Sequence, residues 1–123
     1  MTGHGTIAAT LRTSGVINPV GVINLQNDLL QQSGAILQIT LRGMTAITDF
    51  DQLIVGGNAQ LIGSVESSFE NGFNPDIGST FEVIKYATVS GTHSAVTATG
   101  LGGGKNVSTT VESIRTLLEI IPE

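Results

Sequence analysis

Short apolar segments cut by glycine and proline make up most of this chain. Aliphatic residues occupy alternate positions from Ala35 to Leu41, and a period of two is typical of a β-strand with one buried face. The other apolar segments are too short for helices of ordinary length. We therefore expect strands at residues 6–11, 16–18, 22–25, 35–41, 52–55, 59–62, 64–69 and 80–86.

Two connections carry clear turn signals. Gly56, Gly57 and Asn58 separate segments 52–55 and 59–62, and these residue types tolerate the positive φ of a tight reversal. The sequence therefore predicts either a hairpin or the corner of a solenoid here. Residues 71–78 contain Pro75 and Gly78 and read as an ordered loop. Phe73 and Ile77 are expected to attach this loop to the core.

The C-terminal segment at about residues 109–121 fits two periods. Thr109 and Glu112 have the spacing of a helix capping box, and apolar residues recur at helical spacing after them. Leu117, Glu119 and Ile121 can equally share one face of a strand. A terminal strand is the interpretation we favour, with a short helix as the alternative. The glycine-rich residues 100–104 predict an exposed loop before it.

Composition favours one all-β domain over residues 1–123. The chain is rich in threonine, serine and glycine, which suit half-exposed strands and tight turns. Aromatic residues are only 4% of the chain, which favours a thin core of stacked aliphatic side chains over the wide core of a two-sheet protein. The expected fold is a single-stranded, right-handed parallel β-helix (β-solenoid) with an irregular terminal cap, and the alternative is a β-sandwich or jelly roll.

Charge and cysteine content exclude several functions. The net charge is −5, and the five Lys and Arg residues are isolated from one another, so no basic stripe is available for nucleic acid. The chain has no cysteine, which excludes disulfides and thiolate-bound metals. No apolar run approaches the ~20 residues that cross a bilayer, and no secretion signal is readable in residues 1–10. Membrane insertion by this segment is not expected.

Four parts of the chain resemble a known family. Residues 51–65 are similar to the D-x-L-x-V-x-G-x-A-x-L-x-G-x-L unit of bacterial autotransporter passengers and related secreted surface proteins of PEP-CTERM type, with Val65 in place of the last leucine. Residues 14–25 and 34–43 resemble the segments that precede this unit, so the likeness covers about residues 14–91. The loop that follows it has the form G-F-x-P-x-x-G-x-x-F-x-V-I, supplied here by Gly72, Phe73, Pro75, Gly78, Phe81, Val83 and Ile84.

The resemblance implies the C-terminal end of a long parallel β-helix, where an irregular section shields the open end of the stack. The implied function is that of a non-enzymatic structural or adhesive module of a secreted bacterial protein, located outside the cell or on its surface. Its partners would be the rest of a larger surface protein or further copies of itself, and its loops would contact a glycan or a host surface.

Two other functions remain open. The first is a carbohydrate-binding or polysaccharide-degrading domain. The second is a self-assembling fibre or phage-appendage module. We assign no catalytic, cofactor-binding or metal residue on any of these readings.

Two aspartates and two histidines are candidates for chemistry. Asp49 and Asp51 flank Phe50, and a carboxylate pair on one side of a strand could bind Ca²⁺ or cleave a glycoside. The simpler interpretation is that Asp51 accepts backbone hydrogen bonds at the entry to its strand. His4 and His93 lack a second ligand at metal-site spacing.

The remaining polar residues have a simpler interpretation as well. The amides of residues 24–32 either bind sugar or stack inside the solenoid, and we favour stacking. Four acidic residues are expected on a solvated face. They are Glu66, Glu70, Asp76 and Glu82.

One structural expectation underlies all of these predictions. Aliphatic side chains from successive strands should pile into a narrow column, and the region from Phe73 to Phe81 should close it at one end.

Overall fold

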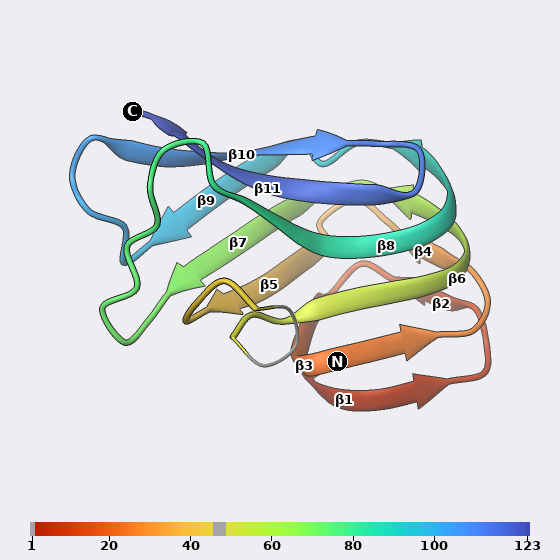
Figure 1. Ribbon diagram of the computed structural model, residues 1–123. Helices are drawn as coiled ribbons and strands as arrows, with labels where there is room; N and C mark the ends of the chain where they lie inside the picture. The colour runs from red at the N-terminus through yellow and green to blue at the C-terminus, as the bar shows by residue number, and fades with distance from the viewer. Residues whose placement is uncertain (1, 46–48) are drawn as a thin grey trace.

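The computed structural model describes residues 2–45 and 49–123, and these residues form an 11-stranded sheet without a helix (Figure 1). The all-β prediction is therefore confirmed. Ala46 to Thr48, which belong to the family-like region, lie outside the described residues. The strands are β1 (Thr2–Ile7), β2 (Leu11–Thr13), β3 (Val16–Leu25), β4 (Leu29–Gln31), β5 (Ile36–Leu41), β6 (Gln52–Leu61), β7 (Ser64–Phe69), β8 (Thr80–Gly91), β9 (Ala95–Thr99), β10 (Lys105–Val111) and β11 (Arg115–Pro122).

Most neighbouring strands are parallel and lie far apart in sequence. β3 pairs with β6, and β6 pairs with β8. On another face β5 pairs with β7, and β7 with β9. Among the named strands, antiparallel pairing is confined to β8 with β11 and β10 with β11. This pairing does not favour the β-sandwich or jelly-roll alternative, because those folds are built from antiparallel strands.

The sheet curves round into a nearly closed, barrel-like form of mixed strands (Figure 1). Its path runs from β10 through β11, β8, β6, β3, β5 and β7 to β9. β1 joins this path at β3, while β4 lies between β2 and β6. The two ends of the path are close together, since β10 also contacts β9. The apolar faces of all these strands therefore point into one interior.

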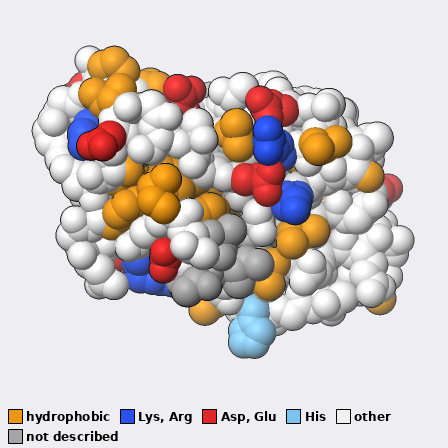
Figure 2. Space-filling view, in the orientation of Figure 1, with side chains coloured by type: hydrophobic (Ala, Val, Ile, Leu, Met, Phe, Trp, Pro, Cys, Tyr) orange, Lys and Arg blue, Asp and Glu red, His pale blue; other side chains and the backbone are white. Residues whose placement is uncertain are grey.

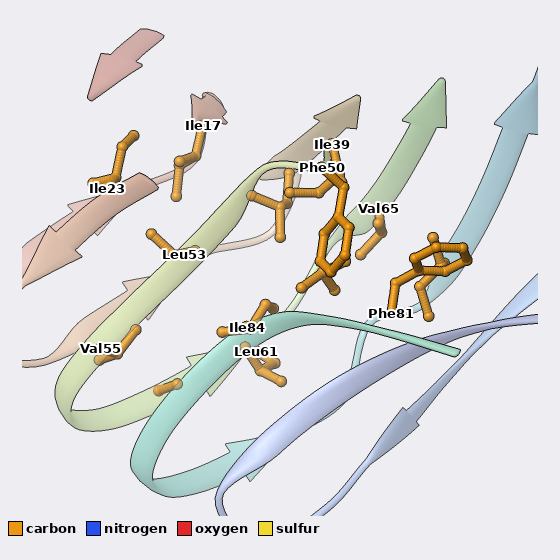
Figure 3. Packing of buried hydrophobic residues seen from close by; sticks show 14 of the residues in the cluster. Ile17, Ile23, Ile39, Phe50, Leu53, Val55, Leu61, Val65, Phe81 and Ile84 are labelled. Carbon is orange, nitrogen blue, oxygen red and sulfur yellow. The ribbon is translucent and has the colours of Figure 1, made fainter. Parts of the chain in front are cut away.

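The interior is a column of aliphatic side chains, as the alternation predicts. Ile23 is in register with Leu53, and Leu53 with Ile84, and all three are buried (Figure 3). The four alternate residues from Ala35 to Leu41 are likewise buried. Stacking one aliphatic residue on another from strand to strand fills a narrow core without large rings.

Gly56 to Asn58 form a corner, and the hairpin alternative is wrong. β6 runs through these residues as one bent strand. Its first part pairs with β3, where Leu53 lies beside Ile23, and its second part pairs with β4, where Ala59 lies beside Leu29. A hairpin would instead pair the two parts with each other.

Two N-terminal boundaries differ from the prediction. Residues 6–11 do not form one strand, because β1 ends at Ile7 and β2 begins at Leu11. Residues 16–18 and 22–25 are joined in β3 despite Pro19 and Gly21. The register with β1 shifts just beyond the pair of Pro19 with Gly3, and proline is tolerated where a ladder is irregular.

The C-terminal segment is a β-hairpin of β10 and β11, so the helix alternative is wrong. Thr116, Leu118 and Ile120 are its buried positions, while the face expected to carry Leu117 and Ile121 is only half-buried. β11 also pairs with β8 over Thr80 to Lys85. Pairing with β10 on one side and with the distant β8 on the other outweighs the local helical spacing.

The loop before β8 belongs to an aromatic cluster at one side of the core. Phe73 packs against Phe69 and Phe81, with ring centroids 6.2 and 5.9 Å apart, and Phe81 also meets Phe50 at 5.3 Å. Ile77 is 53% exposed, so the expectation that it attaches the loop is wrong. Phe81 lies in the core and Phe73 packs against it, so both rings point inward as expected, while the hydrogen-bonding edge of β8 is covered by β11.

Candidate functional site

Asp51 is a structural residue at the junction of three strands. Its side chain lies at the start of β6 and is 3% exposed. Oδ1 accepts a hydrogen bond from the backbone N–H of Gly21 at 2.9 Å, and Oδ2 accepts one from the N–H of Thr40 at 3.0 Å. The interpretation that Asp51 accepts backbone hydrogen bonds is therefore confirmed. These bonds connect β6 to β3 and β5.

Asp49 has a separate local role. Its Oδ2 accepts the N–H of Thr45 at 3.2 Å within the loop that precedes β6. Over residues 2–45 and 49–123, no three His, Cys, Asp or Glu side chains gather closely enough to hold a metal ion. The two carboxylates thus bind different backbone groups, two N–H groups for Asp51 and one for Asp49.

The two histidines lie in opposite environments. His4 is exposed, whereas His93 is 8% exposed at the turn between β8 and β9. Nε2 of His93 lies 2.9 Å from Oε1 of Gln31, and an amide oxygen only accepts, so Nε2 carries the proton. Burial lowers the pKa of His93 from 6.5 to about 4. His93 is therefore neutral at physiological pH.

The Gln31–His93 pair keeps two buried atoms without a hydrogen-bond partner in the described structure, Nε2 of Gln31 and Nδ1 of His93. Sequence reasoning missed this pair. Residues 24–32 were expected to stack amide on amide, but Gln31 binds a histidine 62 residues away. No local pattern signals a contact over that separation.

The acidic residues expected on a solvated face divide into two groups. Glu66, Glu70 and Asp76 are exposed, as predicted. Glu82 is half-buried and forms an ion pair with Arg115 at 3.3 Å and a longer one with Lys85 at 3.8 Å. Figure 2 shows acidic and basic side chains gathered over β8 and the C-terminal hairpin. Ion pairs this exposed contribute little to stability.

A groove of about 400 Å³ lies on the outer face of β5, β7 and β9. These strands lie side by side in parallel (Figure 1). Their residues alternate between the interior and this face. The groove is lined by Asn18, Gln38, Ile39, Thr40, Glu66, Ser67, Ser68, Thr97 and Thr99.

The groove is polar but holds little titratable chemistry. Glu66 is its one charged lining residue, and Nε2 of Gln38 donates a hydrogen bond to Oε1 of Glu66 at 3.1 Å. A single exposed carboxylate without a second acid or a base does not form an acid–base pair. Among its lining residues the groove therefore holds no pair of carboxyl groups.

Comparisons with known proteins add no function to this geometry. None of the described residues forms a helix long and apolar enough to cross a bilayer. The resemblance to autotransporter passengers stays a prediction. No family model matches the chain, and no curated protein matches it.

Proposed function

We propose that this chain is the terminal unit of a right-handed parallel β-helix and serves as a non-enzymatic structural and adhesive module of a secreted bacterial surface protein. The parallel ladders support the β-helix part of the proposal. Val22 is in register with Gln52, and Leu53 with Ile84, so the chain returns twice to the same face after about 30 residues, whereas the first return, from β1 to β3, is shorter. Repeated parallel returns to one face are typical of a solenoid.

The observation that carries the proposal is the difference between the two ends of the sheet. At one end β11 lies antiparallel on β8, and the hairpin buries Val107, Leu118 and Ile120. On the N-terminal side, β1 pairs only with β3 among the described strands, and in parallel; β10 also pairs with a single strand, β11, but in antiparallel. An open strand edge invites further strands to add, and a covered edge stops them. A module of this kind would end a stack of β-helix strands at its C-terminal hairpin and allow further strands to add beside β1.

The non-enzymatic part rests on the chemistry of the acidic residues. Asp51, the best candidate for a catalytic carboxylate, already accepts two backbone hydrogen bonds in a buried place. Glu66 stands alone in the groove. Hydrolysis of a glycoside requires two carboxyl groups facing the same bond.

Removal of the hairpin tests the capping role. We expect a chain that ends at residue 104 to keep the circular-dichroism signal of β-structure but to associate through the uncovered edge of β8, as measured by size-exclusion chromatography with light scattering. A peptide of residues 105–123 added in excess should restore the species formed by the full chain.

Two outcomes contradict the capping role. One is a shortened chain with the same oligomeric state and the same unfolding midpoint as the full chain. The other is a shortened chain on which the added peptide has no effect, whether that chain is folded or not. The same light-scattering measurement on the full chain tests the fibre alternative. A mass of the full-chain species that rises with protein concentration would favour self-assembly.

Adhesion is tested separately with the full chain. Beads coated with the protein should be retained on bacterial cells or extracellular-matrix proteins more strongly than beads coated with an unrelated β-protein of similar charge. Equal retention of the two bead types on every surface contradicts the adhesive role and leaves the capping experiment unaffected.

A further inference from the structure

Two rows of polar side chains run along the groove on β5, β7 and β9. The in-register parallel pairing aligns Gln38 with Glu66 and Glu66 with Thr97. It aligns a second row two residues further on, which consists of Thr40, Ser68 and Thr99. Neighbours within a row are separated by the spacing of strands in a sheet, roughly 4.8 Å. The rows therefore cross the strands and form two parallel walls.

Buried residues form the floor between the walls. Ile39 and Ser67 line the groove although they are only 1% and 3% exposed. Ser67 uses its hydroxyl to donate to the carbonyl of Thr97 at 2.8 Å, so this part of the floor is fixed. The volume of about 400 Å³ falls within the range of roughly 300–1,000 Å³ that is usual for small-molecule sites.

The lining selects a class of ligand by its chemistry. Its polar side chains are hydroxyls, amides and one carboxylate, with no lysine, arginine, histidine or aromatic ring among the lining residues. A hydroxyl both donates and accepts hydrogen bonds, and an amide offers one group of each kind. An anionic ligand would have no cation to bind among the lining residues and would be repelled by Glu66. An apolar ligand would leave the polar groups of the walls without hydrogen-bond partners.

We propose that this groove binds a short stretch of uncharged carbohydrate, whose hydroxyl groups pair with the two rows. This inference goes beyond the proposed capping role and does not depend on it, because the hairpin contributes no lining residue. Stacking on aromatic rings, a major source of affinity in other sites, is absent from the lining. We therefore expect weak but specific binding.

The binding site can be located by nuclear magnetic resonance of the full chain. We expect an uncharged hexasaccharide of glucose, xylose or mannose to produce saturable shifts at residues 38–40, 66–68 and 97–99. An oligogalacturonate serves as the anionic comparator and should bind more weakly. The proposal is overturned if none of the uncharged sugars binds at millimolar concentration, if the comparator binds best, or if the shifts lie on another face.

Matched threonine variants test the contacts. Thr97 and Thr99 are exposed on β9, and replacing both with valine keeps the β-branched shape while removing two hydroxyls. We expect affinity to fall about tenfold. The control is the pair Thr88→Val and Thr110→Val, exposed threonines of β8 and β10 outside the groove. Equal affinities of the two double variants contradict the proposal.

A charge variant tests the exclusion of anions. Glu66→Gln removes the one lining carboxylate while keeping the length of the side chain. We expect oligogalacturonate to bind this variant more tightly than it binds the original chain, with affinity for the uncharged sugar changed less than threefold. Unchanged binding of the comparator would show that Glu66 does not set the selectivity.

Discussion

Burial of His93 makes the stability of the protein depend on pH. The unfolded chain takes up a proton on this residue below about pH 6.5, whereas the folded chain does so only near pH 4. Between these values the unfolded state binds more protons, so acidification favours unfolding. We expect the contribution of His93 to the free energy of unfolding to be independent of pH above about 6.5. Below that pH it should fall, by about 3 kcal/mol towards pH 4.

Urea unfolding at several pH values measures this effect. The variant His93→Gln should lose the part of the pH dependence between 6.5 and 4. The matched variant His4→Gln should keep it, because His4 is exposed. Identical pH profiles for the original chain and His93→Gln would contradict the assignment.

Asp51 should contribute more to stability than its neighbour Asp49. In Asp51→Ala the N–H groups of Gly21 and Thr40 lose their partner, and an unpaired buried donor costs about 1–3 kcal/mol. We expect the free energy of unfolding to fall by about 2–4 kcal/mol, measured by urea denaturation. Asp49→Ala loses one exposed bond and should cost less than about 1 kcal/mol. Similar losses in both variants would contradict the structural role of Asp51.

At the scale of single elements, the turn between β6 and β7 depends on a glycine. Gly63 has φ +88°, and a Cβ there would overlap the carbonyl oxygen of Ala35, the residue before β5. Both the conformation and the space exclude a side chain. We expect Gly63→Ala to lower the free energy of unfolding by at least about 3 kcal/mol.

Gly72 offers a control for this variant. It also has a positive φ, +74°, but no atom lies within 4 Å of its Cβ position. Gly72→Ala therefore isolates the cost of the backbone conformation, about 1–2 kcal/mol. Thermal unfolding of the two variants gives the comparison, and equal losses would show that the contact with Ala35 has no effect.

The C-terminal hairpin shows how an element is decided by its neighbours. Thr109 and Glu112 have helix-cap spacing, yet Thr109 pairs with Leu118 across two strands. Tyr86 of β8 donates its hydroxyl hydrogen to the carbonyl of Glu112 at 2.8 Å, so the turn of the hairpin is held by a third strand. A helix would forfeit these contacts with β8.

At the scale of the whole molecule, the sheet should be least stable at β1. This strand has a paired neighbour on one side only among the described strands, and His4 and Thr6 are exposed. β6 lies between β3 and β8 and carries buried residues such as Leu53 and Leu61. Backbone amides with few buried contacts open more readily.

Amide hydrogen exchange measures this gradient. We expect the amides of residues 3–7 to exchange at least about a hundredfold faster than those of Leu53, Val55 and Leu61, which corresponds to about 2.7 kcal/mol or more of opening free energy. Equal protection across β1 and β6 would mean that the sheet opens as one unit.

The strands and the role of Asp51 were predictable from the sequence, because the pattern of neighbouring residues determines them. The alternation from Ala35 to Leu41 identified a strand and its buried face. The position of Asp51, a short acidic residue just before a strand, predicted that its carboxylate accepts backbone hydrogen bonds, as it does. The groove was not predictable, since Gln38, Glu66 and Thr97 become neighbours only through parallel pairing.

The sequence by itself determined the kind of secondary structure, the loops at residues 71–78 and 100–104 and the aliphatic nature of the core, because these follow from the preferences of neighbouring residues. Tertiary structure alone decided that Gly56 to Asn58 form a corner, that the C-terminal segment is a hairpin lying on β8, and that Gln31 meets His93. The physical reason is that each of these features depends on hydrogen bonds between segments distant in the chain, which no local pattern encodes.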